Sequence, residues 1–301
     1  MTAGNPGVRV AFAGLGAMGW PMAARLVGAG FDVVGVDAQP GRAAQFAAEV
    51  GGSAAAEPAE AASGACIVIT MLPTSVQVEA VLDAMRPALT PGTLIIDMTS
   101  GQPAVTRRLA EALAPADIIL VDAPVSGGVV RARDGTLAIM TGGQDAALDR
   151  AEPLLRTMGT TIHRVGAVGS GQAMKALNNL VSAGGFLIGV EALLIGQRFG
   201  LDPALMVDVL NASTGMNNST QRKFKQFVLS RSFDAGFGLD LMVKDLGIAL
   251  EVGRDTSTPT PFAALCREMW ASAAALLGPG QDHTALARLS ERLAGQELGN
   301  G

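Results

Sequence analysis

A lysine and two asparagines stand close together in a long apolar part of the chain. In GSGQAMKALNN, residues 169–179, Lys175 precedes Asn178 and Asn179 by three and four residues. The stretch 173–196 contains only one other charged residue. Because charged side chains are rarely buried unless they are paired or used, this lysine is the first sign of chemistry in the sequence.

Helical spacing places the three polar side chains on one face of a helix. A lysine buried near a cleft has a lowered pKa, because its ammonium is desolvated, and it can then act as a general acid or base near neutral pH. The asparagines would orient a substrate. Taken by themselves, these residues equally allow a lysine that extends to water from the first turn of the helix.

A glycine-rich turn near the N-terminus indicates a dinucleotide. It follows the apolar run VRVAFAG and precedes a helical pattern, as a GxGxxG fingerprint must. The first glycine permits the tight turn, the second lets a pyrophosphate approach the backbone, and the third lets the helix pack on the strand. The predicted contacts in this loop are Gly14, Leu15, Gly16, Ala17, Met18 and Gly19.

The residue that ends the next strand predicts which dinucleotide is used. Asp37 follows the apolar run DVVGV, where an acidic side chain hydrogen-bonds the ribose 2′-hydroxyl and repels a 2′-phosphate. The nearest arginine, Arg42, stands five residues further on. We therefore expect NAD as the cofactor rather than NADP.

Two further strand ends are expected to line the cofactor crevice, since ligands bind beyond the carboxyl ends of such strands. They supply Met71, Leu72 and Pro73 after one strand, and Thr99 and Ser100 after another. The same residues would also serve as ordinary strand-to-helix turns with a Thr or Ser cap, and the two interpretations are compatible.

A Ser-Gly-Gly triplet follows a strand in DAPVSGGVVRARDGTLAIMTGG, residues 122–143. Successive backbone N–H groups beside a hydroxyl can form an anion-binding cup that would accept a substrate carboxylate. The predicted cup consists of Ser126, Gly127 and Gly128. The triplet alone is also typical of a flexible turn.

The pattern of the chain changes near residue 165. Short apolar runs alternate with helical stretches before it, which predicts an α/β Rossmann-type, doubly wound parallel sheet. The runs are 8–14, 32–38, 66–72, 93–99, 117–125, 137–143 and 161–166. Beyond it we expect an all-α domain with helices at 172–199, 203–212, 218–231, 238–254, 259–277 and 282–295. The predicted domains are 1–165 for NAD binding and 166–301, opened by a long interdomain helix, for substrate binding and oligomerisation.

Composition excludes several other functions. A net charge of −5 in 301 residues argues against a nucleic-acid surface, and the apolar stretch around 180–196 suits a buried helix better than a membrane span. The N-terminus lacks the features of a signal peptide, and two widely separated cysteines, expected to be inert packing residues, suit the cytoplasm. No metal site is expected, the two histidines are expected to be structural, and the absence of tyrosine excludes Tyr-Lys dehydrogenase chemistry.

The chain resembles the β-hydroxyacid dehydrogenases, typified by 3-hydroxyisobutyrate dehydrogenase. The resemblance extends over nearly the whole length and is carried by FAGLGAMGWPMA, DAPVSGGVVRARDGTLAIMTGG, GSGQAMKALNN and GFGLDLMVKDLGIALE. It implies that Lys175 is the catalytic acid/base, and that Asn179 and the Ser-Gly-Gly triplet bind the substrate. It also implies that Lys244 lies near the nicotinamide, that Leu72, Pro73 and Ser100 contact the cofactor, and that the protein forms dimers or tetramers.

One region, STGMNNST at residues 213–220, departs from the best-known members. They carry an arginine, and often a tryptophan, after the glycine. The resemblance implies 3-hydroxyisobutyrate or a close analogue as the substrate expected first. Because this region departs from the family pattern, tartronate semialdehyde, L-serine, threonate and sulfolactaldehyde remain alternatives. An imine reductase or a non-catalytic NAD-binding protein is disfavoured, since such relatives tend to lack the lysine.

Overall fold

The computed structural model describes residues 7–299, so the first six residues of the N-terminal stretch considered above lie outside it. The described chain forms two compact units, which divide between Lys175 and Ala176. The sequence-based boundary stands ten residues earlier, at 165/166. The long helix α8 (Ser170–Phe199) begins in the first unit and continues into the second.

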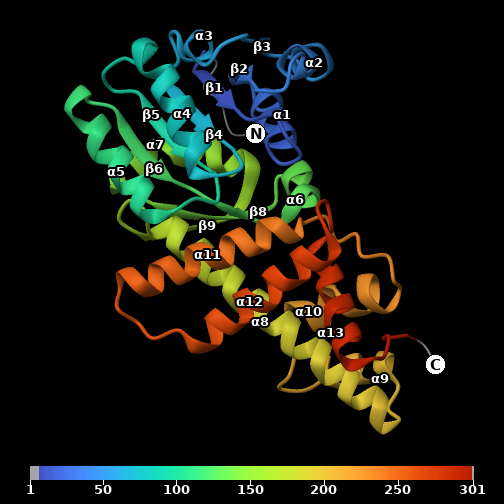
Figure 1. Cartoon of the computed structure of the whole chain (residues 1–301). Coiled ribbons are helices and arrows are strands. Elements are labelled where there is room, and N and C mark those ends of the chain that lie inside the picture. Colours follow the sequence, from blue (N-terminus) through green and yellow to red (C-terminus); the bar gives the residue numbers. More distant parts are fainter. Residues whose placement is uncertain (1–6, 300–301) are drawn as a thin grey trace. The chain divides into compact units, whose positions relative to one another are not determined.

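The N-terminal unit is built on one sheet, whose strand order is β3-β2-β1-β4-β5-β6-β8-β7, with β9 paired to β8 (Figure 1). The strands are β1 (Arg9–Ala13), β2 (Asp32–Val36), β3 (Ser53–Ala54), β4 (Ile67–Thr70), β5 (Leu94–Asp97), β6 (Ile119–Asp122), β7 (Val125–Ser126), β8 (Leu137–Gly142) and β9 (Gly159–Gly166). The first six strands in this order are parallel, as predicted, and have the Rossmann arrangement.

Strand β8 departs from the parallel arrangement predicted for the sheet. β8 is antiparallel to both β6 and β7, so the sheet is mixed. The predicted run 117–125 splits into two short strands, with Ala123 and Pro124 between them. The two-residue strand β3 was not predicted, since its exposed residues lie in an Ala-rich stretch without an apolar run.

Helices cover both faces of the sheet, which explains why most parallel strands are continuous apolar runs. One face packs mainly against α1 (Gly19–Gly28) and α7 (Asp145–Met158), with contributions from α2 (Arg42–Glu49) and α6 (Gly128–Asp134). The other packs against α3 (Pro58–Ala62), α4 (Ser75–Met85) and α5 (Pro103–Leu113). The short 3-10 turns Arg86–Ala88 and Ala114–Ala116 follow α4 and α5.

Strand register aligns the residues that end the parallel strands. Ala13 of β1 is paired with Val36 and Thr70, Thr70 is paired with Asp97, and Asp97 with Asp122. The carboxyl ends of β2, β1, β4, β5 and β6 therefore meet at one edge of the sheet. This edge is the place where such sheets bind ligands.

The C-terminal unit is helical, as predicted. After α8 it contains α9 (Pro203–Asn211), α10 (Asn218–Arg222), a π-helical turn (Phe224–Leu229), α11 (Leu239–Asp255), α12 (Pro261–Leu277), a 3-10 turn (His283–Leu286) and α13 (Ala287–Ala294). Its core includes the fully buried rings of Phe186, Phe224 and Trp270. In the described chain only α8 has the length and hydropathy of a membrane span, yet 56% of its most apolar window is buried, as in a core helix.

Several local expectations need correction. The helix predicted at 218–231 is broken at Lys223, where α10 ends and the π-helical turn follows. Cys66 is exposed, so inert packing is wrong for it, although Cys266 is buried. His283 opens a 3-10 turn rather than lying in a loop, and it is buried against the rings of Phe186 and Trp270.

Candidate functional site

The glycine loop after β1 is held by close backbone contacts. Gly14 has φ of 98°, and a Cβ there would lie 2.2 Å from the carbonyl oxygen of Met71. A Cβ on Gly19 would lie 1.8 Å from the carbonyl oxygen of Gly14. Gly16 differs, since a Cβ there would meet no protein atom within 4 Å. The protein itself therefore requires glycine at 14 and 19, and leaves the backbone of Gly16 open to a ligand.

Asp37 is joined to this loop. Its Oδ2 atom accepts a hydrogen bond from the backbone N–H of Leu15 at 2.6 Å, and its Oδ1 accepts from Gln39 N–H at 2.8 Å. The carboxylate thus stands beside the glycine loop at the carboxyl end of β2. The loop, the start of α1 and this carboxylate suit the pyrophosphate and ribose of a dinucleotide.

The two other predicted strand ends are connected to each other. The Thr99 hydroxyl accepts a hydrogen bond from Leu72 N–H at 3.0 Å, and Thr99 N–H donates to Asp97 Oδ1 at 3.1 Å. The backbone of Met71 lies close to the glycine loop, since its carbonyl oxygen would be 2.2 Å from a Cβ on Gly14. Pro73 and Ser100 follow directly in the same two turns.

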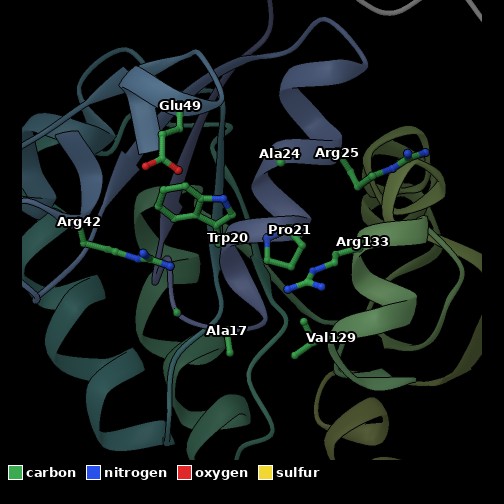
Figure 2. A pocket seen from close by; sticks show the side chains of 10 residues that line it. Ala17, Trp20, Pro21, Ala24, Arg25, Arg42, Glu49, Val129 and Arg133 are labelled. Atoms are coloured by element: carbon green, nitrogen blue, oxygen red, sulfur yellow. The ribbon is translucent and has the colours of Figure 1, made fainter. Parts of the chain in front are cut away.

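A pocket of about 550 Å³ extends from the glycine loop along the outer side of α1 (Figure 2). Trp20 lies at its centre, and the guanidinium of Arg42 stacks 4.0 Å from the Trp20 ring while donating to the Leu15 carbonyl at 2.9 Å. Its lining includes Gly16 and Ala17 but not Asp37 or the β4 and β5 ends. Most of this pocket therefore lies outside the predicted cofactor contacts.

Two buried aspartates at the strand ends hold the start of α8. Asp122 Oδ1 accepts from Gly169 N–H at 2.7 Å and Oδ2 accepts from Gln172 N–H at 2.8 Å, so the carboxylate caps the helix. The Gln172 amide accepts from Gly101 N–H at 2.8 Å and donates to Asp97 Oδ2 at 3.3 Å. The orientation of α8 in the N-terminal unit is therefore fixed by hydrogen bonds to β5 and β6.

Burial changes the acidity of both aspartates. Desolvation raises the pKa of Asp97 to about 6, although hydrogen bonds from Thr70, Thr99 and Gln172 oppose it. Desolvation also raises the pKa of Asp122 to about 6, against the hydrogen bonds from Gly169 and Gln172. Both carboxyls therefore take up a proton at a higher pH than an exposed aspartate does.

The hydrogen bonds that join Asp97 and Asp122 to the start of α8 were not predicted from the sequence. The available signal was an Asp at the end of two apolar runs, TLIID and DIILVD, together with a polar Gln in the first turn of the helix. Strand register, which the sequence did not show, brings Asp97 and Asp122 side by side.

Lys175 lies in the second turn of α8 and is 8% exposed. The same helix face continues with Asn178, Asn179 and Ser182. Asn179 donates to Asp245 Oδ2 at 2.5 Å and accepts from Asn178 at 3.0 Å, which fixes its amide. The predicted polar face is therefore present.

Lys244 and Ser126 lie in different units. The Lys244 ammonium is 3.3 Å from Asp245 Oδ1 on α11, and its proximity to a nicotinamide stays a prediction. Ser126 ends β7, and Gly127 and Gly128 follow with φ of 141° and 70°, values that only glycine adopts readily. The Ser-Gly-Gly triplet is thus a sharp turn that leads into α6.

Side chains of the divergent segment STGMNNST form hydrogen bonds within the segment itself. Asn217 caps α10 by accepting hydrogen bonds from Ser219 N–H at 2.7 Å and Thr220 N–H at 3.2 Å, and the Thr220 hydroxyl accepts from Asn217 N–H to complete a capping box.

Among residues 7–299 no three His, Cys, Asp or Glu side chains cluster as a metal site would require. His163 is exposed on β9.

Both halves of the chain match known families. Residues 9–167 match the NAD binding domain of 6-phosphogluconate dehydrogenase, and residues 169–290 match the family described as NAD-binding of NADP-dependent 3-hydroxyisobutyrate dehydrogenase. The 3-hydroxyisobutyrate dehydrogenase of Pseudomonas aeruginosa is 38% identical over 87% of this chain and 90% of its own length. The chain belongs to the 3-hydroxyisobutyrate dehydrogenase family.

Two other relatives cover still more of the chain. The 2-(hydroxymethyl)glutarate dehydrogenase of Eubacterium barkeri is 34% identical over 98% of both chains. The structure of Mycobacterium tuberculosis 3-hydroxyisobutyrate dehydrogenase with L-serine is 35% identical and superimposes with a TM-score of 0.87, covering 93% of this chain and 98% of that one. The protein is thus an NAD(P)-dependent oxidoreductase of the β-hydroxyacid dehydrogenase family, as the sequence motifs predicted.

Proposed function

We propose that the protein is an NAD-dependent dehydrogenase of a small β-hydroxyacid, 3-hydroxyisobutyrate or an analogue, with Lys175 as the general acid/base. The observation that carries the proposal is the buried Lys175 on a helix whose start is fixed by Asp122 and Gln172. Tartronate semialdehyde, L-serine, threonate and sulfolactaldehyde remain alternative substrates.

Lys175 moves the proton of the reaction. In the oxidation of the alcohol, its neutral amine takes the hydroxyl proton while the C–H bond is broken and the carbonyl forms. In the reverse direction its ammonium returns that proton to the oxygen. NAD, when bound, accepts or supplies the hydride.

The other residues place the substrate. Ser126, Gly127 and Gly128 would bind the substrate carboxylate with a hydroxyl and backbone N–H groups. The Asn179 amide, fixed by Asp245, would contact the substrate one turn along α8 from Lys175. Such positioning supplies much of the rate enhancement in bimolecular chemistry.

Asp37 supports the proposed preference for NAD. Its carboxylate stands beside the glycine loop, where a ribose 2′-hydroxyl can donate to it and a 2′-phosphate would be repelled. Arg42, the nearest arginine along the chain, is engaged by the Leu15 carbonyl and the Trp20 ring. We expect Asp37→Asn to lower the ratio of kcat/KM with NAD to kcat/KM with NADP.

Self-association is also proposed. One face of α8 exposes apolar side chains at seven-residue spacing, a pattern suited to helix pairing: Met174, Val181, Ile188 and Ile195. A dimer or tetramer in light scattering would agree with this surface, whereas a monomer at micromolar concentration would contradict it.

The proposed activity is tested with a panel of hydroxyacids. The purified protein is mixed with NAD or NADP at alkaline pH and reduced cofactor is followed by absorbance. We expect turnover of one or more β-hydroxyacids, with a higher kcat/KM for NAD than for NADP. The absence of turnover for every β-hydroxyacid with both cofactors would refute the proposed function.

A further inference from the structure

A second lysine, Lys223, lies along the same helix face as the catalytic residue. Its Nζ atom donates to the hydroxyl of Ser182 at 3.3 Å. Ser182 stands seven residues after Lys175 on α8, two turns along the same face, which corresponds to a rise of roughly 10 Å. The polar face that begins at Lys175 therefore ends at an ammonium group.

This ammonium lacks a paired carboxylate within the described chain. Lys225, two residues on, forms an ion pair with Asp208 at 2.6 Å, whereas Lys223 makes no ion pair among residues 7–299. It is only partly exposed, and the Phe186 ring lies 5.9 Å from Nζ. Burial lowers the pKa of Lys223 to about 8, and the Asp282 charge opposes that shift. A partly desolvated cation that forms no ion pair is costly to bury, and an anionic ligand that pairs with it would lower that cost.

We propose that Lys223 is the specificity residue for the distal end of the substrate, and that the preferred substrate is a β-hydroxyacid with a second carboxylate or similar anion. This inference rests on the proposed function, because it takes the reacting hydroxyl to lie at Lys175. The distal anion accepts a charge-assisted hydrogen bond from the Lys223 ammonium, which forms no ion pair among residues 7–299. An uncharged distal methyl group, as in 3-hydroxyisobutyrate, leaves the cation unpaired.

Lys223 lies outside the four motifs that carry the family resemblance, so the motifs do not predict this role. It stands three residues after STGMNNST, at the break between α10 and the π-helical turn. The capping box of Asn217 and Thr220 fixes the start of α10, and thereby the path of the chain to Lys223. The divergent segment thus acts on specificity through its fold, while the contact is made by the lysine.

The test compares two substrates and three variants. Wild type, Lys223→Met, Lys223→Arg and the control Lys225→Met are assayed with NAD on 2-(hydroxymethyl)glutarate and on 3-hydroxyisobutyrate. We expect wild type to prefer the diacid, and Lys223→Met to lose about 100-fold or more in kcat/KM for it, mainly through KM, as for loss of a buried charge pair. The monoacid should change less than about threefold, and Lys223→Arg should retain the preference.

Other results separate the two proposals. Equal losses on both substrates would show that Lys223 only supports the fold, and unchanged diacid kinetics would overturn its role while the activity stands. If wild type oxidises no β-hydroxyacid, the proposed function fails. Calorimetric titration of the protein with glutarate still tests whether Lys223 binds an anion. Binding that Lys223→Met abolishes and Lys225→Met preserves would support the anion site, whereas absent or unaltered binding would refute it.

Discussion

The carboxylate of Asp122 caps α8 by accepting a hydrogen bond from the backbone N–H of Gln172, three residues before Lys175. Its other oxygen accepts from Gly169 N–H, so both oxygens are used. Hydrogen bonds thereby join the end of β6 to the start of α8. The placement of Lys175 depends on this contact as much as on the helix that carries it.

We expect Asp122→Asn to lower kcat. An asparagine offers one acceptor oxygen to two N–H groups, and its own NH₂ would face one of them, so a buried hydrogen bond is lost at about 1–3 kcal/mol. Stability should fall by this amount in denaturant titrations, and kcat should fall at least tenfold with the KM for NAD unchanged. Asp117→Asn, an exposed position just before the same strand, is the control. A loss of stability with full kcat would contradict a positioning role.

The raised pKa of Asp97 predicts a pH-dependent stability. Its pKa is raised from 3.8 to about 6 in the folded protein, mainly by desolvation, so the folded state favours the protonated form. The resulting stabilisation is full below about pH 4 and is lost as the pH rises to about 6. The stability of wild type relative to Asp97→Asn should therefore decrease by up to about 3 kcal/mol between pH 4 and 7. Urea unfolding of both proteins across this range measures it, and a constant difference would exclude the shift.

Replacement of Lys175 separates chemistry from binding. Lys175→Ala removes the proposed proton carrier, and we expect kcat to fall by at least about 10²–10⁴-fold. The glycine loop and Asp37 are untouched, so NADH should bind as in wild type, which fluorescence titration would show. An active Lys175→Ala protein would require another acid/base.

Two glycines of the loop, Gly16 and Gly19, should respond differently to alanine. At Gly16 the new Cβ meets no protein atom, so Gly16→Ala should fold normally and bind NAD at least tenfold more weakly, because the Cβ would obstruct the pyrophosphate. Gly19→Ala should destabilise the protein itself, given a Cβ 1.8 Å from Gly14 O. Gly28→Ala, where a Cβ meets nothing, is the control for both. Normal NAD binding by Gly16→Ala would place the cofactor elsewhere.

Part of the fold and of the candidate site could be predicted from the sequence, and the rest depends on contacts between distant segments. Apolar runs predicted the parallel strands because such strands are buried on both faces, and the spacing of Lys175, Asn178 and Asn179 predicted their shared face. The pairing of Asp97 with Asp122 could not be predicted, since it depends on strand register between segments 25 residues apart. The proposed role of Lys223 could not be predicted either, because the sequence shows only a lysine in a polar stretch. Its contact with Ser182 of α8 is seen only in the structure.

The selectivity between diacid and monoacid substrates should depend on pH. Lys223 is charged below its pKa of about 8 and neutral above it, so the ratio of kcat/KM for the two substrates should be constant below about pH 7 and fall above pH 8. The other titratable groups near it contribute little to this change. Desolvation opposes the shift, but hydrogen bonds from His283 and Thr284 hold the pKa of Asp282 below its ordinary value, so its carboxylate stays ionised throughout. Burial lowers the pKa of His283, which keeps that ring neutral.

The ratio isolates Lys223, because protonation of Lys175 affects both substrates alike and cancels. Lys223→Arg keeps its charge to high pH, so its selectivity should persist to pH 10, and the ratio for Lys223→Met should be low and flat. Initial rates between pH 6 and 10 provide the profiles. A wild-type ratio that does not fall, or one that falls equally in Lys223→Arg, would assign the selectivity to a group other than this ammonium.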